Sequence, residues 1–282
     1  MIERLDPPAL LEVLPALAAL DVRSATAFAT GHLSGAGHIP LAELEERRGE
    51  LPPRDIALLV TAEDGARARV AAERIEALGY GRVLWLDGAI ADLPAALVDS
   101  TPAARLWRPS PFLEAMLPRL PDPARDECRV LDLAAGAGRE AVFLAQRGYR
   151  VEAWDHDRSA LDKARALAGR HGVTLHTEMR DLERRDPRLP VGEHRVVMVF
   201  RFLHRPLFPR IGAAVAPGGF VIYETYLKGQ ERFGRPKHPR FLLDSGELPG
   251  HFPGFTIEHY EESTPASGPL LARLLARRPE IA

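Results

Sequence analysis

The sequence predicts an α/β protein of two domains, each built on a mostly parallel sheet. Short apolar runs alternate with longer amphipathic segments along most of the chain, a pattern typical of strand–helix–strand units. This alternation occurs twice, on either side of a proline-rich stretch at residues 102–123. A chain of 282 residues is also long enough for two domains of ordinary size.

In the first domain, three apolar runs are predicted to be buried strands, with one alanine-rich helix between the last two. The helix is expected at 66–78, because Val70 and Ile75 have helical spacing and Gly79 follows where a left-handed C-terminal residue is expected. We place the end of this domain at residue 97. The strands are expected at 19–22, 56–61 and 82–86.

Residues 98–126 are predicted to be a linker that holds one helix, at 111–119, which we expect to form part of a lid. The second domain is predicted at 127–282. Its order of elements, β-α-β-α-β-β-α-β, favours a doubly wound sheet. Its strands are expected at 129–133, 150–154, 174–178, 195–200 and 219–224, and its helices at 139–147, 159–171 and 207–214.

Composition excludes several classes of protein. The formal net charge is −2, so we expect no basic surface for nucleic acid. Cys128 is the single cysteine, which excludes an internal disulfide and a multi-cysteine metal site, and we expect no metal. The apolar segment at 9–20 is too short to span a bilayer and lacks the features of a signal peptide. We therefore expect a cytoplasmic protein without a membrane partner.

The main functional motif is the segment LDLAAGAGREA at 131–141, which joins the first strand and first helix of the second domain. Small residues at Ala134, Gly136 and Gly138 would let a ligand approach the backbone closely. The N–H groups at the start of the helix favour acceptor or anionic groups, and ligands of open α/β sheets bind at this end of the strands. Residues 136–141 also match the pattern of nicotinamide and flavin binders, so the glycines alone fit two classes of cofactor.

Residues outside the glycine-rich segment help to distinguish these two classes of cofactor. Asp132 lies inside the first strand, where a dinucleotide binder normally has an apolar residue. Asp155 ends the second strand and could accept hydrogen bonds from ribose hydroxyls of either cofactor. Asp181 and Leu182 follow the third strand, and suit the amino group and the ring of an adenine. With the turn at 216–219 before the fifth strand, these residues favour S-adenosylmethionine.

These segments resemble the class I S-adenosylmethionine-dependent methyltransferases. LDLAAGAGR, VEAWDHD, MRDLE and VAPGGFVIYE occur in the family's order and at similar spacing, over about residues 106–278. Ala134 and Ala135 stand where many members have Gly-Cys. The resemblance implies a Rossmann-like fold and S-adenosylmethionine as cofactor, with the acidic residue in the first strand helping to hold its methionine end. The cofactor-binding residues predicted in this way are Asp132, Ala134, Gly136, Gly138, Arg139, Asp155, His156, Asp181, Leu182 and Phe200.

The methyl acceptor is expected to bind near the loop at 201–206, after the fourth strand. Methyl transfer from a sulfonium is a direct displacement, so positioning matters most, and a base is needed only for a protonated nucleophile. The loop lacks the Asn/Asp-Pro-Pro-aromatic motif of amino-methylating enzymes, which disfavours nucleic-acid bases and amide nitrogens. With residues 224–239, it resembles small methyltransferases of tellurite resistance and thiopurine detoxification, which implies a small, soft or anionic acceptor.

Several candidate residues of the acceptor site also fit roles other than binding or catalysis. The basic residues after the fifth strand also suit a solvated loop, and His204 also suits a structural role. Tyr223 and Tyr226 alternate along a strand end, so only one of them is expected to face the site. The candidate catalytic residues are His204 and Tyr226, and the candidate substrate-binding residues are Trp107, Arg201, Glu224, Arg232, Arg235 and Lys237.

The first domain resembles the rhodanese-like domains over residues 20–93, through the motifs DVR, GHLSGA and HIP. In active rhodaneses a cysteine follows the central strand, with glycine three and arginine five residues later. Gly65 and Arg67 stand in the latter two positions, but Ala62 stands in place of the cysteine. Alanine has no nucleophilic atom to carry sulfur, so we predict an inactive domain with a structural or regulatory role.

The sequence therefore predicts a methyltransferase that acts on a small molecule, with an inactive rhodanese-like partner domain. The main alternative is a sensor that binds S-adenosylmethionine without transferring its methyl group. A nicotinamide-dependent oxidoreductase and a sulfurtransferase are further alternatives. A homodimer is compatible with the sequence, and no nucleic-acid partner is expected.

Overall fold

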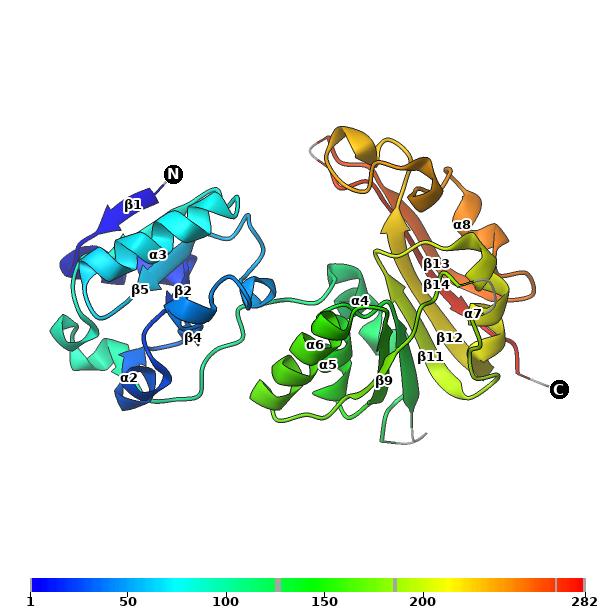
Figure 1. The fold of residues 1–282 in the computed structure, drawn as a ribbon, viewed down its shortest axis with the longest axis horizontal. Coiled ribbons are helices and arrows are strands. Elements are labelled where there is room, and N and C mark those ends of the chain that lie inside the picture. Colours follow the sequence, from blue (N-terminus) through cyan, green and yellow to red (C-terminus); the bar gives the residue numbers. More distant parts are fainter. Residues whose placement is uncertain (1, 125–127, 185–186, 267, 281–282) are drawn as a thin grey trace. The chain divides into compact units, whose positions relative to one another are not determined.

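The computed structural model describes residues 2–124, 128–184, 187–266 and 268–280. The chain divides into two compact units, Met1–Arg108 and Pro109–Ala282 (Figure 1). Each unit is an α/β structure around its own sheet, which confirms the predicted class. The division differs from the expected domain end at residue 97, and the other expected boundary, at 126–127, lies outside the described residues. No helix in the described part of the chain has the length and apolar character needed to span a bilayer.

The first unit contains a five-stranded parallel sheet in the order β1-β6-β5-β2-β4, and a two-stranded antiparallel pair, β3 and β7. Val98 and Asp99 form β7, so residues expected to be linker belong to this unit. The strands are β1 (Ile2–Leu5), β2 (Ala18–Asp21), β3 (His32–Leu33), β4 (Gly37–His38), β5 (Leu58–Thr61), β6 (Val83–Leu86) and β7 (Val98–Asp99), and the helices are α1 (Leu10–Val13), α2 (Ala25–Thr30) and α3 (Gly65–Ala77).

Helix α3 packs on this sheet through its small side chains. Ala68, Ala71 and Ile75 are fully buried, as expected from their helical spacing. Val70 was counted with the same apolar face, but it is 43% exposed because it points away from the sheet. Gly79 has a φ of 91°, which confirms the predicted left-handed residue after the helix.

The second unit contains a seven-stranded sheet in the order β10-β9-β8-β11-β12-β14-β13. β14 pairs antiparallel with both β12 and β13, and the other neighbouring strands pair parallel. The strands are β8 (Arg129–Leu133), β9 (Arg150–Asp155), β10 (His176–Met179), β11 (His194–Phe200), β12 (Val215–Tyr226), β13 (Thr256–Ser263) and β14 (Leu271–Arg277), and the helices are α4 (Pro111–Met116), α5 (Arg139–Ala145), α6 (Arg158–Arg170), α7 (Phe208–Ala214) and α8 (Glu247–Gly250).

Helices cover this sheet on both faces, as predicted for a doubly wound fold. Helices α5 and α6 pack beside β9 and β10, whereas α7 packs on β11 and β12 (Figure 1). The chain leaves β8 toward β9 and β10, and then returns to pair β11 with the other side of β8. The order of the strands therefore reverses between β8 and β11, and ligands of such sheets bind outside the carboxyl ends at this point.

Candidate functional site

The turn between β8 and α5 lies at this reversal, and its backbone is left-handed at three positions. Ala134, Gly136 and Gly138 have φ values of 59°, 55° and 76°. We call residues 134–138 the glycine turn. A Cβ atom added at Gly138 would come within 2.7 Å of the Ala164 Cβ, so this glycine lets α5 pack against α6. At Gly136 the same atom would meet no described atom within 4 Å, so the turn faces open space there.

Asp155, at the end of β9, fixes the shape of the glycine turn. Its Oδ2 accepts a hydrogen bond from the Gly136 N–H at 2.8 Å, and its Oδ1 accepts one from the Asp157 N–H at 2.9 Å. The His156 Nδ1 lies 3.2 Å from Oδ1, but this side chain is 78% exposed. A carboxylate can accept about four hydrogen bonds, so Asp155 retains capacity for a ligand.

Asp132 is the least satisfied polar group of the site. Its side chain is buried on β8, and its Oδ2 has no hydrogen-bond partner among the described residues. Burial raises the pKa of Asp132 well above its ordinary value, and the nearby charges of Glu140 and Asp155 raise it further. A buried acceptor without a partner destabilises a protein, unless a ligand supplies the donor.

The remaining predicted cofactor residues lie at the ends of the neighbouring strands. Asp181 is exposed just after β10, where its Oδ1 accepts a hydrogen bond from the Glu183 N–H at 2.9 Å, and Leu182 is buried. Phe200 ends β11 and is partly buried, whereas Arg139 is exposed at the start of α5. The predicted set therefore lines one edge of the sheet, at the carboxyl ends of β8, β9, β10 and β11.

Glu224 is the centre of a buried network on β12. Its side chain is fully buried, and its Oε1 lies 3.1 Å from both the Ser110 Oγ and the Arg201 Nη2. Its Oε2 accepts a hydrogen bond from the Arg273 Nε at 2.6 Å. Arg273 also binds Glu261, at 2.6 Å. Because Glu224 is enclosed by these groups, it would act on a substrate through Arg201.

Arg201 is held in a conformation that favours glycine. Its φ is 60°, and its N–H donates to the Glu224 carbonyl at 2.7 Å. Its guanidinium carbon lies 5.0 Å from the centre of the Tyr226 ring, and its side chain is 36% exposed. Non-glycine residues with such backbones are uncommon and are concentrated at functional sites. Tyr223 lies on the other face of β12, buried in the core, where its hydroxyl donates to the Phe202 carbonyl at 2.9 Å.

Ser110 connects the donor and acceptor sides of the site. Its N–H donates to the Glu140 Oε1 at 3.1 Å, and its Oγ bonds to Glu224 and accepts from the Phe112 N–H at 3.2 Å. It therefore caps α4 while joining α5, the helix that follows β8, to β12. In the sheet, β11 lies between β8 and β12. The Ser-Pro pair before an apolar run is a helix-start signal that could have identified Ser110. Arg273 could not be found, because its strand was not predicted.

His204 lines a cavity of about 280 Å³ beyond the end of β11. Arg205 beside it is bound to Glu247, with contacts of 2.6 and 2.8 Å. Arg240 and Phe241 contribute the wall that follows β12. His204 and Tyr226, the two candidate catalytic residues, thus have different surroundings: this cavity and the guanidinium of Arg201.

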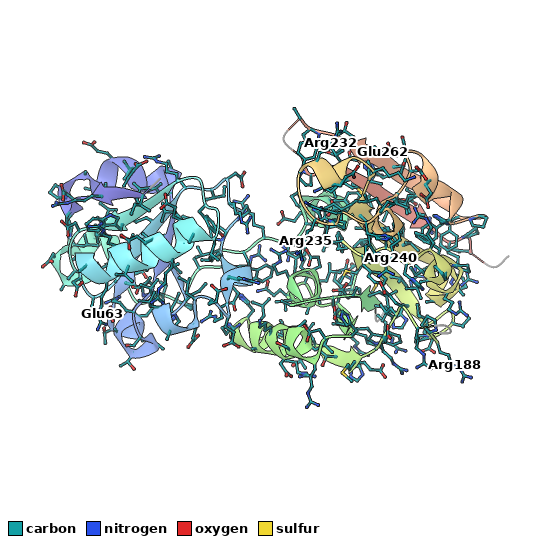
Figure 2. All side chains as sticks on the ribbon, turned by 45° about the horizontal axis from the view of Figure 1, so that its top comes forward. Glu63, Arg188, Arg232, Arg235, Arg240 and Glu262 are labelled. Atoms are coloured by element: carbon teal, nitrogen blue, oxygen red, sulfur yellow. The ribbon has the colours of Figure 1, made fainter. Side chains whose placement is uncertain are left out.

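The predicted basic residues lie on the segment between β12 and α8, where Figure 2 labels Arg232, Arg235 and Arg240. Arg232 is exposed, and its Nε donates to the Gly229 carbonyl at 3.2 Å. Arg235 and Lys237 are exposed, and neither forms an ion pair within the described residues. Their charges are therefore available to solvent or to an anionic ligand.

Trp107 was predicted to contact the substrate, but it belongs to the first unit. Its side chain is buried, with the Arg105 guanidinium 4.8 Å from the centre of its ring. Its role in substrate binding therefore stays a prediction.

In the first unit, a side chain of the loop after β5 already occupies the start of α3. Ala62, in the position of the rhodanese cysteine, is 1% exposed. The Asp64 carboxylate caps α3 by accepting a hydrogen bond from the Arg67 N–H at 2.8 Å. Glu63, labelled in Figure 2, lies 3.4 Å from the Arg67 guanidinium. The helix start therefore already holds a negative charge.

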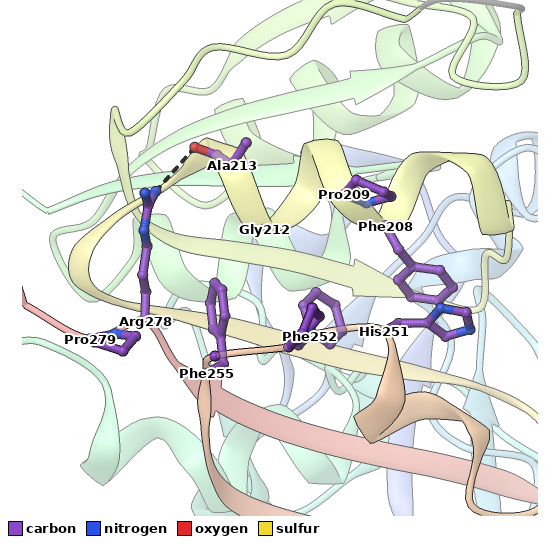
Figure 3. A pocket seen from close by; sticks show the side chains of 11 residues that line it. Phe208, Pro209, Gly212, Ala213, His251, Phe252, Phe255, Arg278 and Pro279 are labelled. Carbon is purple, nitrogen blue, oxygen red and sulfur yellow. Dashed lines mark hydrogen bonds between the residues drawn. The ribbon is translucent and has the colours of Figure 1, made fainter.

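A larger cavity, of about 410 Å³, lies between α7 and the segment that follows α8 (Figure 3). Four of its eleven lining residues are aromatic, Phe208, His251, Phe252 and Phe255, and Phe208 stacks on His251 with 3.9 Å between ring centres. Arg278 closes one end and donates to the Ala213 carbonyl at 3.3 Å. None of the predicted site residues lines this cavity.

Comparison with known proteins gives a family match for each unit. Residues 8–95 match the rhodanese-like domain, and residues 124–264 match the tellurite resistance protein TehB. Both matches confirm the resemblances found in the sequence.

Individual relatives are more distant. The chain is 28% identical over 142 residues to Hemagglutinin 1 of Eikenella corrodens, which covers 48% of this chain and 46% of that protein. It is 29% identical over 84 residues to the probable S-adenosyl-L-methionine-dependent methyltransferase TehB of Haemophilus influenzae, covering 30% and 29%. The chain thus spans less than half the length of these relatives.

Matches to solved structures cover a larger share of this chain. The structure of TehB from Haemophilus influenzae has a TM-score of 0.48 at 18% identity, covering 61% of this chain and 62% of that one. An S-adenosylmethionine-dependent methyltransferase from Mesorhizobium loti has a TM-score of 0.48 at 21% identity, covering 60% and 96%.

Proposed function

Since this chain belongs to the family of the tellurite resistance protein TehB through residues 124–264, half of its length, we propose that it transfers a methyl group from S-adenosylmethionine to a small-molecule acceptor. The observation that carries the proposal is the unpaired carboxylate of Asp132 beside the glycine turn. Together they offer a buried acceptor and open space at the end of the sheet where ligands bind.

The residues present fit this cofactor. The unpartnered oxygen of Asp132 would accept a hydrogen bond from the ammonium of the methionine part, and a charge-assisted bond of this kind is strong. Asp155 would receive the ribose hydroxyls, and Asp181 with Leu182 would contact the adenine. When bound, S-adenosylmethionine supplies an activated methyl group on a sulfonium. The protein residues bind the cofactor, orient it and exclude water.

For the acceptor, we propose a small anionic or soft molecule bound beside Arg201. Glu224 and the Tyr226 ring hold this guanidinium, yet its side chain remains partly exposed, so it retains donors for an anion. Arg235 and Lys237 would add positive charge nearby. We further propose His204 and Tyr226 as candidates to take a proton when the acceptor arrives protonated.

Two features of the second unit disfavour a nicotinamide cofactor. Dinucleotide-binding sheets have the order 3-2-1-4-5-6, whereas here the antiparallel β14 lies between β12 and β13. In addition, the acidic Asp132 stands in the first strand. The family match at 124–264 supports the same choice.

For the rhodanese-like domain, we propose a structural or regulatory role without sulfur transfer. Ala62 has no nucleophilic atom, and the Asp64 carboxylate already occupies the start of α3. A persulfide intermediate therefore has neither an attachment point nor an open anion site in this loop.

Isothermal titration calorimetry with S-adenosylmethionine, S-adenosylhomocysteine and NAD tests the donor. We expect binding of the first two and none of NAD; the reverse would overturn the proposal. Turnover is then measured with labelled S-adenosylmethionine against thiols, selenite, tellurite and halides. Methylation of one of these supports the enzyme, whereas binding without turnover on any of them favours the sensor.

A further inference from the structure

Three acidic residues lie close enough where β8 ends to influence one another electrostatically, without a fixed cation among the described residues. Asp132 lies on β8, Glu140 in the first turn of α5 and Asp155 at the end of β9. The hydrogen bonds to Glu140 come from the Ser110 N–H, and those to Asp155 from two backbone N–H groups. The exposed His156 is the one titratable partner of the cluster in the described structure.

Asp132 is the member of the cluster whose negative charge no group in the described residues stabilises. From β9 the nearest side chain in register is Ala153, and from β11 it is Met198, and both are apolar. The charged groups that face it, Glu140 and Asp155, are both acidic. A buried carboxyl in such surroundings keeps its proton, because the neutral acid avoids desolvation and repulsion.

We propose that binding of S-adenosylmethionine displaces a proton from Asp132, so that the methyl donor and a proton compete for the site. The O–H bond of the Asp132 carboxyl breaks, the proton passes to solvent, and the carboxylate that remains accepts hydrogen bonds from the ammonium of the cofactor. One positive charge replaces another, so the charge balance of the cluster is preserved. This inference rests on the proposed function, and it adds a proton linkage to donor binding.

The linkage makes donor affinity depend on pH in a defined direction. Where Asp132 is protonated in the free protein and ionised in the complex, each cofactor bound releases one proton, and Kd rises up to tenfold for each unit that the pH falls. Above the pH range in which Asp132 of the free protein is protonated, Kd becomes independent of pH. This holds until the α-amino group of the cofactor loses its own proton near pH 8.

The full chain is titrated by calorimetry at pH 6 in two buffers of different ionisation enthalpy, which gives the number of protons released. We expect release close to one proton with S-adenosylmethionine. S-adenosylhomocysteine keeps the amino acid part and should release the same number. 5′-Methylthioadenosine lacks that part and should release none. Binding of S-adenosylmethionine without proton release would overturn the inference, whereas no binding at all would overturn the proposed function instead.

Variants test whether the released proton comes from Asp132. Asp132→Asn should bind without proton release, and Glu140→Gln, which keeps an oxygen for the Ser110 N–H, should move the pH dependence of Kd to lower pH. Asp162→Asn removes an exposed carboxylate on α6 and should match the wild type. His156→Gln should retain the release. If Asp132→Asn fails to fold, the pH dependence of Kd in Glu140→Gln provides the test. A pH dependence unchanged from the wild type would contradict the inference.

Discussion

Replacing each glycine of the glycine turn by alanine should separate a structural role from a ligand-binding role. Gly138 and Gly136 are both left-handed, with φ values of 76° and 55°, so alanine costs each of them about 1–2 kcal/mol of conformational energy. The two positions differ in what the new Cβ meets. At Gly138 it would lie 2.7 Å from the Ala164 Cβ and 3.3 Å from its Cα, whereas at Gly136 it would meet no described atom within 4 Å.

Gly138→Ala should therefore be the destabilising change. Because the contacted Cα belongs to the backbone of α6, the two helices must move apart, which adds about 1–3 kcal/mol of overpacking. The total of about 2–5 kcal/mol is a large part of the stability of a domain, and predicts a fall in Tm of about 5–15 °C for this unit.

Gly136→Ala should change ligand binding more than stability. Its stability loss is limited to the backbone contribution of about 1–2 kcal/mol, but its methyl group enters the space left for the cofactor. Thermal unfolding and calorimetric titration with S-adenosylmethionine measure both effects. A Gly138→Ala protein as stable as the wild type would refute the packing argument. Unchanged cofactor affinity in Gly136→Ala would refute the placement of the ligand.

Three further predictions follow from single groups. Asp155→Ala should weaken S-adenosylmethionine binding by about 1–3 kcal/mol, which is about 5- to 150-fold in Kd, and should affect activity at saturating cofactor less; unchanged affinity would reject its role. Ala62→Cys should produce no thiocyanate from thiosulfate and cyanide, because the Asp64 carboxylate still caps α3; measurable production by this variant would contradict the argument that the Asp64 cap closes the anion site. Burial of Glu247 opposes its ionisation, but hydrogen bonds led by that from Arg205 outweigh this and lower its pKa to about 2. The stabilisation is therefore complete above pH 4.5 and lost as the pH falls toward 2, so Glu247→Gln should lower the free energy of unfolding in urea at pH 7 and less at pH 3.

The sequence was sufficient to predict the parallel strands at the core of the second unit. The strand at 129–133 has the predicted bounds, because the apolar residues Val130, Leu131 and Leu133, buried on both faces of the sheet, give a clear pattern. The strands β13 and β14 were not predicted. LARLLAR in β14 consists of strong helix formers, and its pairing with β12 and β13 overrides that preference. The edge strand β13 carries many polar residues and lacks a clear alternation.

The candidate site likewise has a part that could be predicted from the sequence and a part that could not. The cofactor residues follow strands that could be predicted, and parallel strands bring their carboxyl ends to one edge, so Asp132, Asp155 and Asp181 could be grouped from order alone. The partners of Glu224 could not, since Arg273 lies on an unpredicted strand and Ser110, although a helix-start signal marks it, lies 114 positions from Glu224 in the chain. Contacts between residues more than a hundred positions apart depend on tertiary packing, which local patterns do not contain.

The two units use the same local device, a turn from a parallel strand into a helix, with opposite results. After β5, the Asp64 side chain satisfies the start of α3, and the residue in the position of the nucleophile is a buried alanine. After β8, the glycine turn leaves open space, and the Asp132 oxygen has no partner in the described structure. Unsatisfied buried polar groups are costly, and they are retained where a ligand completes them. The difference between a loop that satisfies itself and one that does not is therefore the physical reason to assign the chemistry of this chain to the second unit.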